Sequence, residues 1–122
     1  MREIKQIAII GMGKWGKNLI REFAKFSKVK TCITTGNRKN IVWLKENYPD
    51  TNHYTDINKV LNDPDIDAII ISTPINSHFT IAKKSLESKK HIFVEKPLAK
   101  TVNQAEKLIE IANRNQLCLF VG

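Results

Sequence analysis

The sequence has only two cysteines among its 122 residues, and its twelve acidic residues are outnumbered by twenty basic ones. Cys32 and Cys118 both fall in expected strands, which are well separated in the sheet proposed below. We therefore expect no disulfide, which agrees with a reducing compartment, and no bound metal. Two small buried side chains account for both cysteines.

Long apolar runs are also missing. No segment approaches the roughly 18 apolar residues of a membrane span. Near the N-terminus, the charges of Arg2, Glu3 and Lys5 are not followed by the apolar stretch and small-residue cleavage site of a signal peptide. Because 122 residues are enough for one core but not for two, we expect a single cytoplasmic domain without a membrane partner.

The net charge of +8 raises the question of an anionic partner. Basic residues recur at steps of three and four, which would place them on one stripe of a helix: Lys14, Lys17, Arg21, Lys25 and Lys28. Apolar residues occupy the other side of that helix: Leu19, Ile20, Phe23 and Ala24. A solvated face opposite a buried one explains this pattern, and recruitment of a polyanion or anionic substrate is the alternative.

Strand and helix patterns alternate along the whole chain. Apolar or β-branched runs predict strands at 7–10, 29–34, 53–54, 68–72, 91–94 and 117–121. Helical patterns fall between them, among them 38–47, 76–88 and a helix from 102 that buries Val102, Ala105, Leu108, Ile109 and Ala112. This alternation predicts an α/β fold, a doubly wound parallel sheet in the order 3-2-1-4-5-6. A ligand should lie at the carboxyl ends of strands one and four, where the order reverses.

A glycine-rich turn follows the first strand, in the run Gly11-Met12-Gly13-Lys14-Trp15-Gly16. The first glycine lets the chain turn, the second lets the backbone approach a pyrophosphate, and the third lets the helix pack on the strand. Backbone N–H groups from Met12 to Trp15 would point at the anion from the positive end of the helix. An ordinary strand-to-helix turn with three glycines is the alternative.

Two more segments map to the same edge of the sheet, namely Ser72-Thr73-Pro74 with His78 after it, and Glu95-Lys96-Pro97-Leu98-Ala99. With the glycine turn, these motifs occur in the order and approximate spacing of the Gfo/Idh/MocA oxidoreductase family, whose dinucleotide-binding Rossmann half the whole chain resembles. Residues 15–19 look like the branch of the family that acts on nucleotide sugars. From the same resemblance, we expect that this chain lacks the family's second domain, which binds substrate.

The resemblance implies a role for each matching position. Gly11, Gly13 and Gly16 would hold the pyrophosphate, while Ser72, Thr73 and Pro74 would line the nicotinamide side. Many members have Asn directly after this Pro, whereas this chain has Ile75, which cannot supply a side-chain amide. Glu95 would orient the cofactor, Lys96 would face nicotinamide and substrate, and the Lys96–Pro97 peptide bond would be cis.

Lys96 also has a physical case of its own. An ammonium group aimed at a substrate hydroxyl stabilises the alkoxide character that develops as hydride leaves the carbon. Burial that lowered its pKa would let it relay the proton as well. A surface lysine is the alternative. For His78, a helix-start histidine bonded to neighbouring backbone and a ligand contact are both open.

The choice of cofactor depends on the end of the second strand. NAD-specific sites place Asp or Glu there to accept the ribose hydroxyls, and this chain has Thr34 and Thr35 instead. Arg38 follows, and its guanidinium group suits a 2′-phosphate. We therefore expect NADP, with NAD as the alternative.

Two hypotheses about function remain. The first is the NAD(P)-binding half of an oxidoreductase that transfers hydride between the nicotinamide and a sugar or sugar-nucleotide hydroxyl; isolated, it would bind cofactor but catalyse poorly. The second is a stand-alone, non-catalytic module that binds a dinucleotide or polyanion. Nucleic acid is not the expected partner, and self-association is open.

Overall fold

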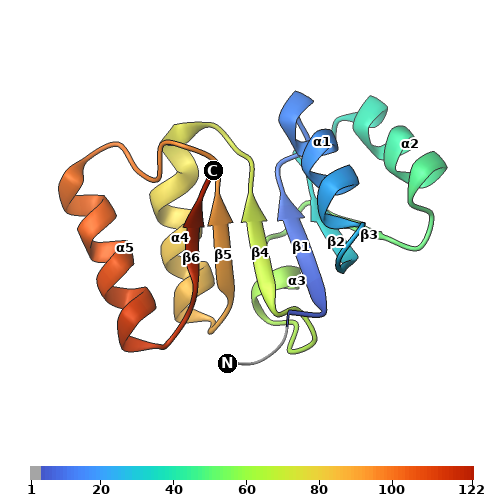
Figure 1. Cartoon of the computed structure of the whole chain (residues 1–122). Coiled ribbons are helices and arrows are strands. Elements are labelled where there is room, and N and C mark those ends of the chain that lie inside the picture. Colours follow the sequence, from blue (N-terminus) through green and yellow to red (C-terminus); the bar gives the residue numbers. More distant parts are fainter. Residues whose placement is uncertain (1–3) are drawn as a thin grey trace.

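The four residues of strand β4, Ala68–Ile71, are all buried, as expected of a strand covered on both faces. The computed structural model describes residues 4–122, but not the side chains of Lys14 and Trp15. Over these residues it has one six-stranded sheet in the order β3-β2-β1-β4-β5-β6, with every pair parallel (Figure 1). The fold class and the strand order predicted from the sequence are therefore confirmed.

Helices alternate with the strands. The strands are β1 (Gln6–Ile10), β2 (Lys28–Ile33), β3 (Asn52–Tyr54), β4, β5 (His91–Val94) and β6 (Leu119–Val121). The helices are α1 (Lys14–Phe23), α2 (Arg38–Asn47), α3 (Asn58–Leu61), α4 (His78–Glu87), preceded by the 3₁₀ turn η1 (Ile75–Ser77), and α5 (Val102–Arg114). None of the helices within residues 4–122 is long and apolar enough to cross a membrane.

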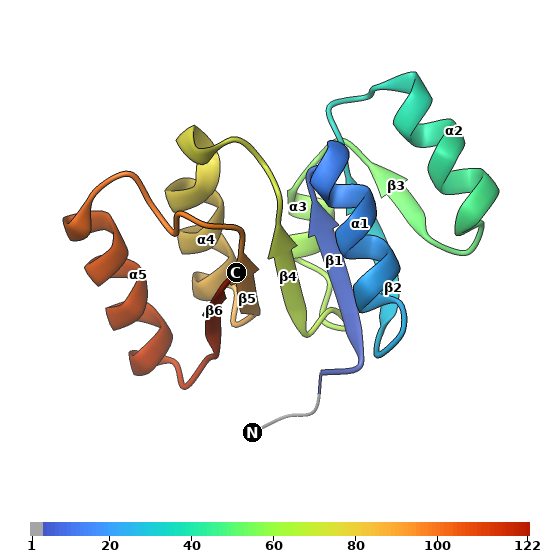
Figure 2. The ribbon, with the colours of Figure 1, turned by 45° about the horizontal axis from the view of Figure 1, so that its top comes forward.

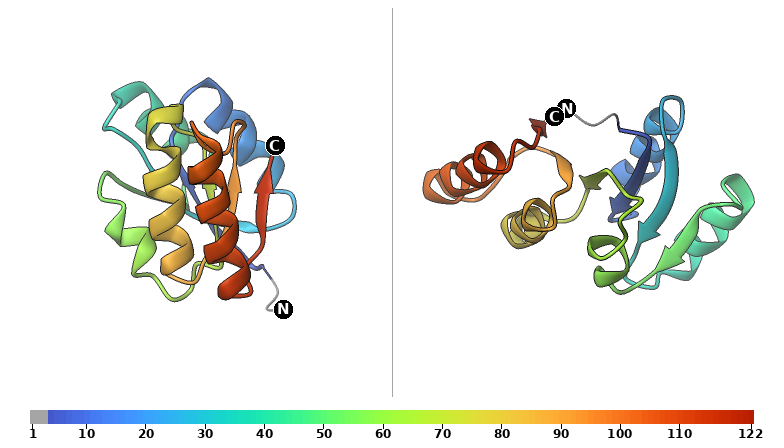
Figure 3. Two further views of the ribbon diagram at one scale, coloured as in Figure 1. Left: turned by 90° about the vertical axis from the view of Figure 1, so that its left-hand side faces the viewer. Right: turned by 90° about the horizontal axis from the view of Figure 1, so that it is seen from below.

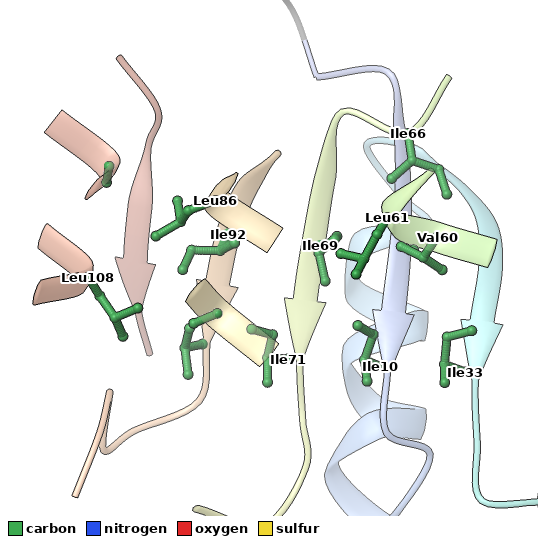
Figure 4. Packing of buried hydrophobic residues seen from close by; sticks show 14 of the residues in the cluster. Ile10, Ile33, Val60, Leu61, Ile66, Ile69, Ile71, Leu86, Ile92 and Leu108 are labelled. Carbon is green, nitrogen blue, oxygen red and sulfur yellow. The ribbon is translucent and has the colours of Figure 1, made fainter. Parts of the chain in front are cut away.

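Alternate residues of each central strand face two separate apolar cores. In β1, Ile7 and Ile9 pack toward α1 and α2, while Ala8 and Ile10 pack toward α3, α4 and α5. Figure 3 shows α4 and α5 next to each other on one side of the sheet and α1 on the opposite side. Figure 4 shows the second core, in which side chains of β1, β4 and β5 meet Leu86 and Leu108 from the helices. Because the strands are parallel, their carboxyl ends share one edge.

The last strand and the buried face of α5 differ from the prediction. The last strand begins at Leu119 and not at Leu117, because the Leu117 N–H donates to the carbonyl oxygen of Ala112 and the Cys118 N–H donates to His91 Nδ1. In α5, Val102 and Ile109 are exposed, because they share a stripe seven residues apart and α5 packs instead through Leu108, Ile111 and Ala112.

The basic stripe is also shorter than predicted. Helix α1 ends at Phe23, so Lys25 lies beyond it and Lys28 begins β2. Ala24 is exposed, whereas Ile20 is fully buried. Only the part of the stripe within α1 has the helical geometry that the spacing suggested.

The buried Cys32 thiol provides a test of the core on the α1 side. Burial raises its pKa to about 12. The thiolate is the reactive form, so we expect iodoacetamide at about pH 8 to leave Cys32 unmodified in buffer and to label it fully in guanidinium. Peptide mass spectrometry would measure both, with the half-buried Cys118 as internal comparison. Labelling of Cys32 in buffer as fast as in denaturant would contradict the burial.

Candidate functional site

The turn after β1 and the first turn of α1 each contain a glycine at a position where a side chain would collide with backbone, Gly11 and Gly16. Gly11 has a φ of +103°, and a Cβ atom built on it would lie 2.3 Å from the carbonyl oxygen of Ser72. A Cβ on Gly16 would lie 2.5 Å from the carbonyl oxygen of Gly11. Gly11 thereby lets β1 approach the end of β4, and Gly16 lets α1 pack against the turn.

Gly13 differs from these two because the space beside it is open. Among the described atoms, none outside Gly13 and its two chain neighbours lies within 4 Å of a Cβ built there, and its φ of −71° suits any residue. Gly13 is also the N-cap of α1, and no side chain caps this helix. Met12 is buried in the α1-side core, so its backbone alone is left for a ligand. Exposed N–H groups and an unobstructed approach are what an anion at a helix N-terminus needs.

The β1–α1 turn and the loop that follows β4 lie next to each other at the carboxyl edge of the sheet (Figure 2). A cleft opens beside this turn at the ends of β1 and β4. Its volume of about 560 Å³ falls within the range of about 300–1,000 Å³ for small-molecule sites. Residues 10–13, 33–35 and 72–74 form most of the wall. Among the described residues the lining includes no charged side chain. The strand order therefore brings the glycine turn, the end of β2 and the β4–α4 loop to one cleft.

The predicted cofactor residues divide into three groups. Those that line the cleft are Gly11, Met12, Gly13, Thr34, Thr35, Ser72, Thr73 and Pro74. Those that lie outside its lining are Gly16, Arg38, His78, Glu95, Lys96 and Pro97. The side chains of Lys14 and Trp15 lie outside the described residues. Sequence reasoning did not assign the other lining residues to the site, namely the polar Asn37, Asn40 and Thr55 and the apolar Ile10 and Ile33.

The two threonines after β2 have different environments. Thr34 is buried, and its Oγ1 accepts a hydrogen bond from the Gly36 N–H (3.1 Å) and lies 2.7 Å from His53 Nε2. Thr35 is exposed in the cleft wall. Thr34 therefore secures the turn that carries Thr35, and Thr35 has the more accessible hydroxyl. Asn37 caps α2 by accepting from the Asn40 N–H (3.2 Å), and its place between Gly36 and the helix was the signal that could have identified it.

Arg38 does not line the cleft but a neighbouring groove between α1 and α2, together with Lys17, Lys39 and Trp43. Lys17 Nζ and the Arg21 guanidinium carbon lie 5.4 and 5.3 Å from the centre of a Trp43 ring. Two residues of the basic stripe thus contact the neighbouring helix by cation–π interactions. This part of the stripe has a structural role in joining α1 to α2.

The β4–α4 loop is held by its own hydrogen bonds. Ser77 Oγ donates to Thr73 Oγ1 (2.6 Å) and to the carbonyl oxygen of Pro74 (2.9 Å). His78 is buried, with Nε2 at 2.7 Å from the Thr73 carbonyl oxygen and Nδ1 at 2.9 Å from that of Pro97. These are the bonds of a histidine satisfied by backbone, the first of the two alternatives left open by the sequence.

Glu95, Lys96 and Pro97 follow β5 at the same edge. Glu95 is half-buried, whereas Lys96 and Pro97 are exposed. The Lys96 N–H donates to the carbonyl oxygen of Gly122 (2.9 Å). The Lys96–Pro97 peptide bond is cis, as the resemblance implies. Because Lys96 is exposed, the burial that would favour a proton relay is not found here.

Residues 4–122, apart from the undescribed side chains, contain no group of three His, Cys, Asp or Glu side chains placed to bind a metal ion. The chemistry of the cleft wall is that of backbone amides, hydroxyls and side-chain amides. Such groups bind phosphate and ribose hydroxyls.

Known proteins with similar sequences include a glycosyl hydrolase family 109 protein and an oxidoreductase. A glycosyl hydrolase family 109 protein from Shewanella sp. (strain ANA-3) is 32% identical over 93% of the chain, which spans 27% of that protein. The uncharacterized oxidoreductase YhhX of Escherichia coli is 42% identical over 53% of the chain and 19% of its own length.

Solved structures have the same fold. Biliverdin reductase from Synechocystis sp. PCC 6803, in complex with biliverdin and NADP⁺, superposes with a TM-score of 0.88 at 24% identity, covering 98% of this chain and 38% of its own. UDP-N-acetylglucosamine 3-dehydrogenase GnnA from Acidithiobacillus ferrooxidans superposes with a TM-score of 0.85 at 23% identity, and the match covers 96% of this chain and 37% of that chain. The chain thus spans about a quarter to two fifths of these longer proteins.

The family model described as "Oxidoreductase family, NAD-binding Rossmann fold" matches residues 5–122. The match covers the glycine turn, the β4–α4 loop and the cis-proline segment together. The chain therefore belongs to the Gfo/Idh/MocA family of oxidoreductases and contains its NAD-binding Rossmann domain.

Proposed function

We propose that the chain binds NADP(H) in the cleft beside Gly13, as the cofactor half of an oxidoreductase that acts on a hydroxyl of a sugar or sugar nucleotide. The open space at Gly13 is the observation that supports this most directly. A pyrophosphate seated there would accept hydrogen bonds from the first-turn N–H groups of α1, which no side chain caps. The neutral lining of the cleft adds no carboxylate to repel it.

Each part of the cleft has a proposed role. Gly11 and Gly16 shape the turn, Gly13 admits the pyrophosphate, Thr35 contacts the adenosine ribose, and residues 72–74 line the nicotinamide side. A direct contact by His78 is not proposed, because both of its ring nitrogens are bonded to backbone carbonyls. The cofactor supplies the hydride acceptor or donor.

We propose that Lys96 acts on the substrate. A bound nicotinamide would supply the hydride acceptor for the carbon that bears the substrate hydroxyl, and the hydroxyl proton would pass to water at this exposed edge of the sheet. The Lys96 ammonium would donate a hydrogen bond to the substrate oxygen and stabilise the negative charge that develops on it. Its exposure at the sheet edge leaves it accessible to a substrate. Groups that position the substrate lie outside this chain in the proposal, because the relatives are longer.

The proposed substrate class is supported by the relatives. One group of them is named for glycosyl hydrolase family 109, one from Shewanella oneidensis is an alpha-N-acetylgalactosaminidase, and GnnA is a dehydrogenase of UDP-N-acetylglucosamine. All of these names refer to sugars or a sugar nucleotide. Cytoplasmic location and self-association stay predictions.

The preference for NADP is proposed from the β2–α2 region. Thr35 stands where a carboxylate would repel a 2′-phosphate, and Arg38 and Lys39 follow in the first turn of α2. Both are exposed in the groove next to the cleft. Two cations beside an uncharged ribose site favour the phosphorylated cofactor.

Replacing Arg38 with alanine should weaken NADPH binding about tenfold, which corresponds to about 1.4 kcal/mol, and leave NADH binding within about twofold. The reason is that the guanidinium group contacts only the 2′-phosphate. Isothermal titration calorimetry with both cofactors measures this. Lys45→Ala, at the far end of α2, is the matched control. Equal losses for NADPH and NADH would rule out the assignment.

Thermal-shift titration with NAD, NADH, NADP and NADPH, repeated at high salt, tests the proposal as a whole. We expect a rise in Tm that is largest with NADP(H). The proposal would be overturned if none of the four dinucleotides raised the Tm while a polyanion bound with an affinity that falls steeply as salt rises. That result would favour the non-catalytic module.

A further inference from the structure

The His78 side chain lies between two loops that leave the sheet at its carboxyl edge. Its residue is only 2% exposed. One ring nitrogen, Nε2, lies 2.7 Å from the Thr73 carbonyl oxygen in the β4–α4 loop. The other, Nδ1, lies 2.9 Å from the Pro97 carbonyl oxygen in the β5–α5 loop. The imidazole thus bridges two segments that are far apart in the sequence.

Both of these partners are acceptors. A carbonyl oxygen cannot donate a hydrogen bond, so each ring nitrogen must carry a proton to bond to it. A neutral imidazole carries one such proton, and the imidazolium ion carries two. In either tautomer one ring nitrogen donates to a loop carbonyl while the other lies against the second carbonyl, so the ring keeps the two loops together.

The two loops have different relations to the cleft. Thr73 and Pro74 line it, whereas Lys96 and Pro97 are exposed beside it. Among the hydrogen bonds of the described residues, the one from His78 to Pro97 is what joins the β4–α4 segment to the residues after Lys96. The Glu95 and Lys96 N–H groups donate to the carbonyl oxygens of Ile71 (3.2 Å) and Gly122 (2.9 Å), and the ring adds the contact that fixes the Pro97 end of the segment beside the nicotinamide side of the cleft.

We propose that His78 is a positioning residue that holds the Glu95-Lys96-Pro97 segment against the nicotinamide side of the cleft. The proposal rests on the proposed function, because it presumes that a dinucleotide occupies the cleft. In this proposal the His78 side chain does not contact the cofactor itself. The adenosine and pyrophosphate parts bind elsewhere, at the glycine turn and the end of β2, and do not depend on it.

The test compares each dinucleotide with the same molecule without nicotinamide: NADP⁺ with 2′-phospho-ADP-ribose, and NAD⁺ with ADP-ribose. In calorimetric titrations, His78→Gln and His78→Phe should lower the affinity for the preferred dinucleotide about tenfold and leave that of its truncated partner within about twofold. A merely structural defect would lower both affinities together.

His91→Gln is the matched control, since His91 is also buried but lies at the start of β5, at the opposite end of that strand from Lys96. It should leave the ratio of the two affinities unchanged. Equal losses for both ligands, or no loss for either, would overturn the role of His78. The role of His78 is also overturned if the wild-type chain binds the truncated ligands and the dinucleotides equally well. If the wild-type chain binds none of the four ligands, the proposed function itself is overturned.

Discussion

Replacing Gly13 with valine is expected to abolish dinucleotide binding, with a loss of affinity of at least about a hundredfold, or about 2.8 kcal/mol. The cleft wall at Gly13 is open, since no described atom beyond its chain neighbours lies within 4 Å of a Cβ built there. The new side chain would therefore occupy the space that the pyrophosphate needs. The backbone there is extended, with a φ of −71°, which valine adopts without strain. Calorimetric titration with NADPH measures the loss.

The same variant should remain folded. Gly13 is the N-cap of α1, and valine is a poorer N-cap than glycine, so a cost of about 1 kcal/mol is expected in the free energy of unfolding. Urea denaturation would measure this cost. Asn18→Val, on an exposed position one turn further along α1, is the control for a changed helix with an intact cleft. NADPH binding that survives in Gly13→Val within a few-fold would show that the phosphates do not approach this glycine.

The architecture could be predicted from the sequence because its signals are local or periodic. The continuous apolar run of β4 predicts a strand covered on both faces, and the alternation of strands with helices predicts the parallel sheet. The glycine turn could be predicted in part for a related reason, since Gly16 is required by a backbone contact with Gly11 within one strand–turn–helix unit. The contact that requires Gly11 is with Ser72 at the end of β4 and follows from the order of the strands.

The side-chain contacts that complete the site could not be predicted in this way. Thr34 and Thr35 are equivalent as residue types, and only the contact with His53, nineteen residues away, separates the buried one from the accessible one. The bridge from His78 to Pro97 also spans nineteen residues. Such contacts depend on how neighbouring strands position the loops that follow them, and a local sequence pattern does not predict that position.

The prediction of the buried face of α5 was wrong for another physical reason. A stripe of apolar residues marks a packing face only where a helix is covered on that side, and α5 lies near the edge of the sheet (Figure 1). Val102 and Ile109 are therefore exposed although they fit the helical spacing, whereas Ile111 is buried next to Leu108 and Ala112. The periodicity was correct, but the orientation of the helix was set by tertiary contacts.

The largest loss of stability is expected for Gly11→Ala, and Gly36→Ala is its matched comparison. Both glycines have positive φ, +103° and +91°, so alanine carries a similar backbone penalty of about 1–2 kcal/mol at either position. They differ in their surroundings: a Cβ at Gly11 would lie 2.3 Å from the Ser72 carbonyl oxygen, whereas one at Gly36 would have its nearest neighbour at 4.0 Å, a methyl group of Thr55.

The difference between the two variants measures the approach of β1 to β4. Ser72 is fixed by its own N–H bond to the carbonyl oxygen of Ile10 (2.8 Å), so neither strand can yield without breaking the ladder. We expect Gly11→Ala to lower the free energy of unfolding by about 4 kcal/mol or more, against about 1–2 kcal/mol for Gly36→Ala. Urea denaturation of both variants would test this. Equal losses would mean that the close contact at the turn relaxes freely, and that the cleft beside it is more deformable than a preformed pyrophosphate site requires.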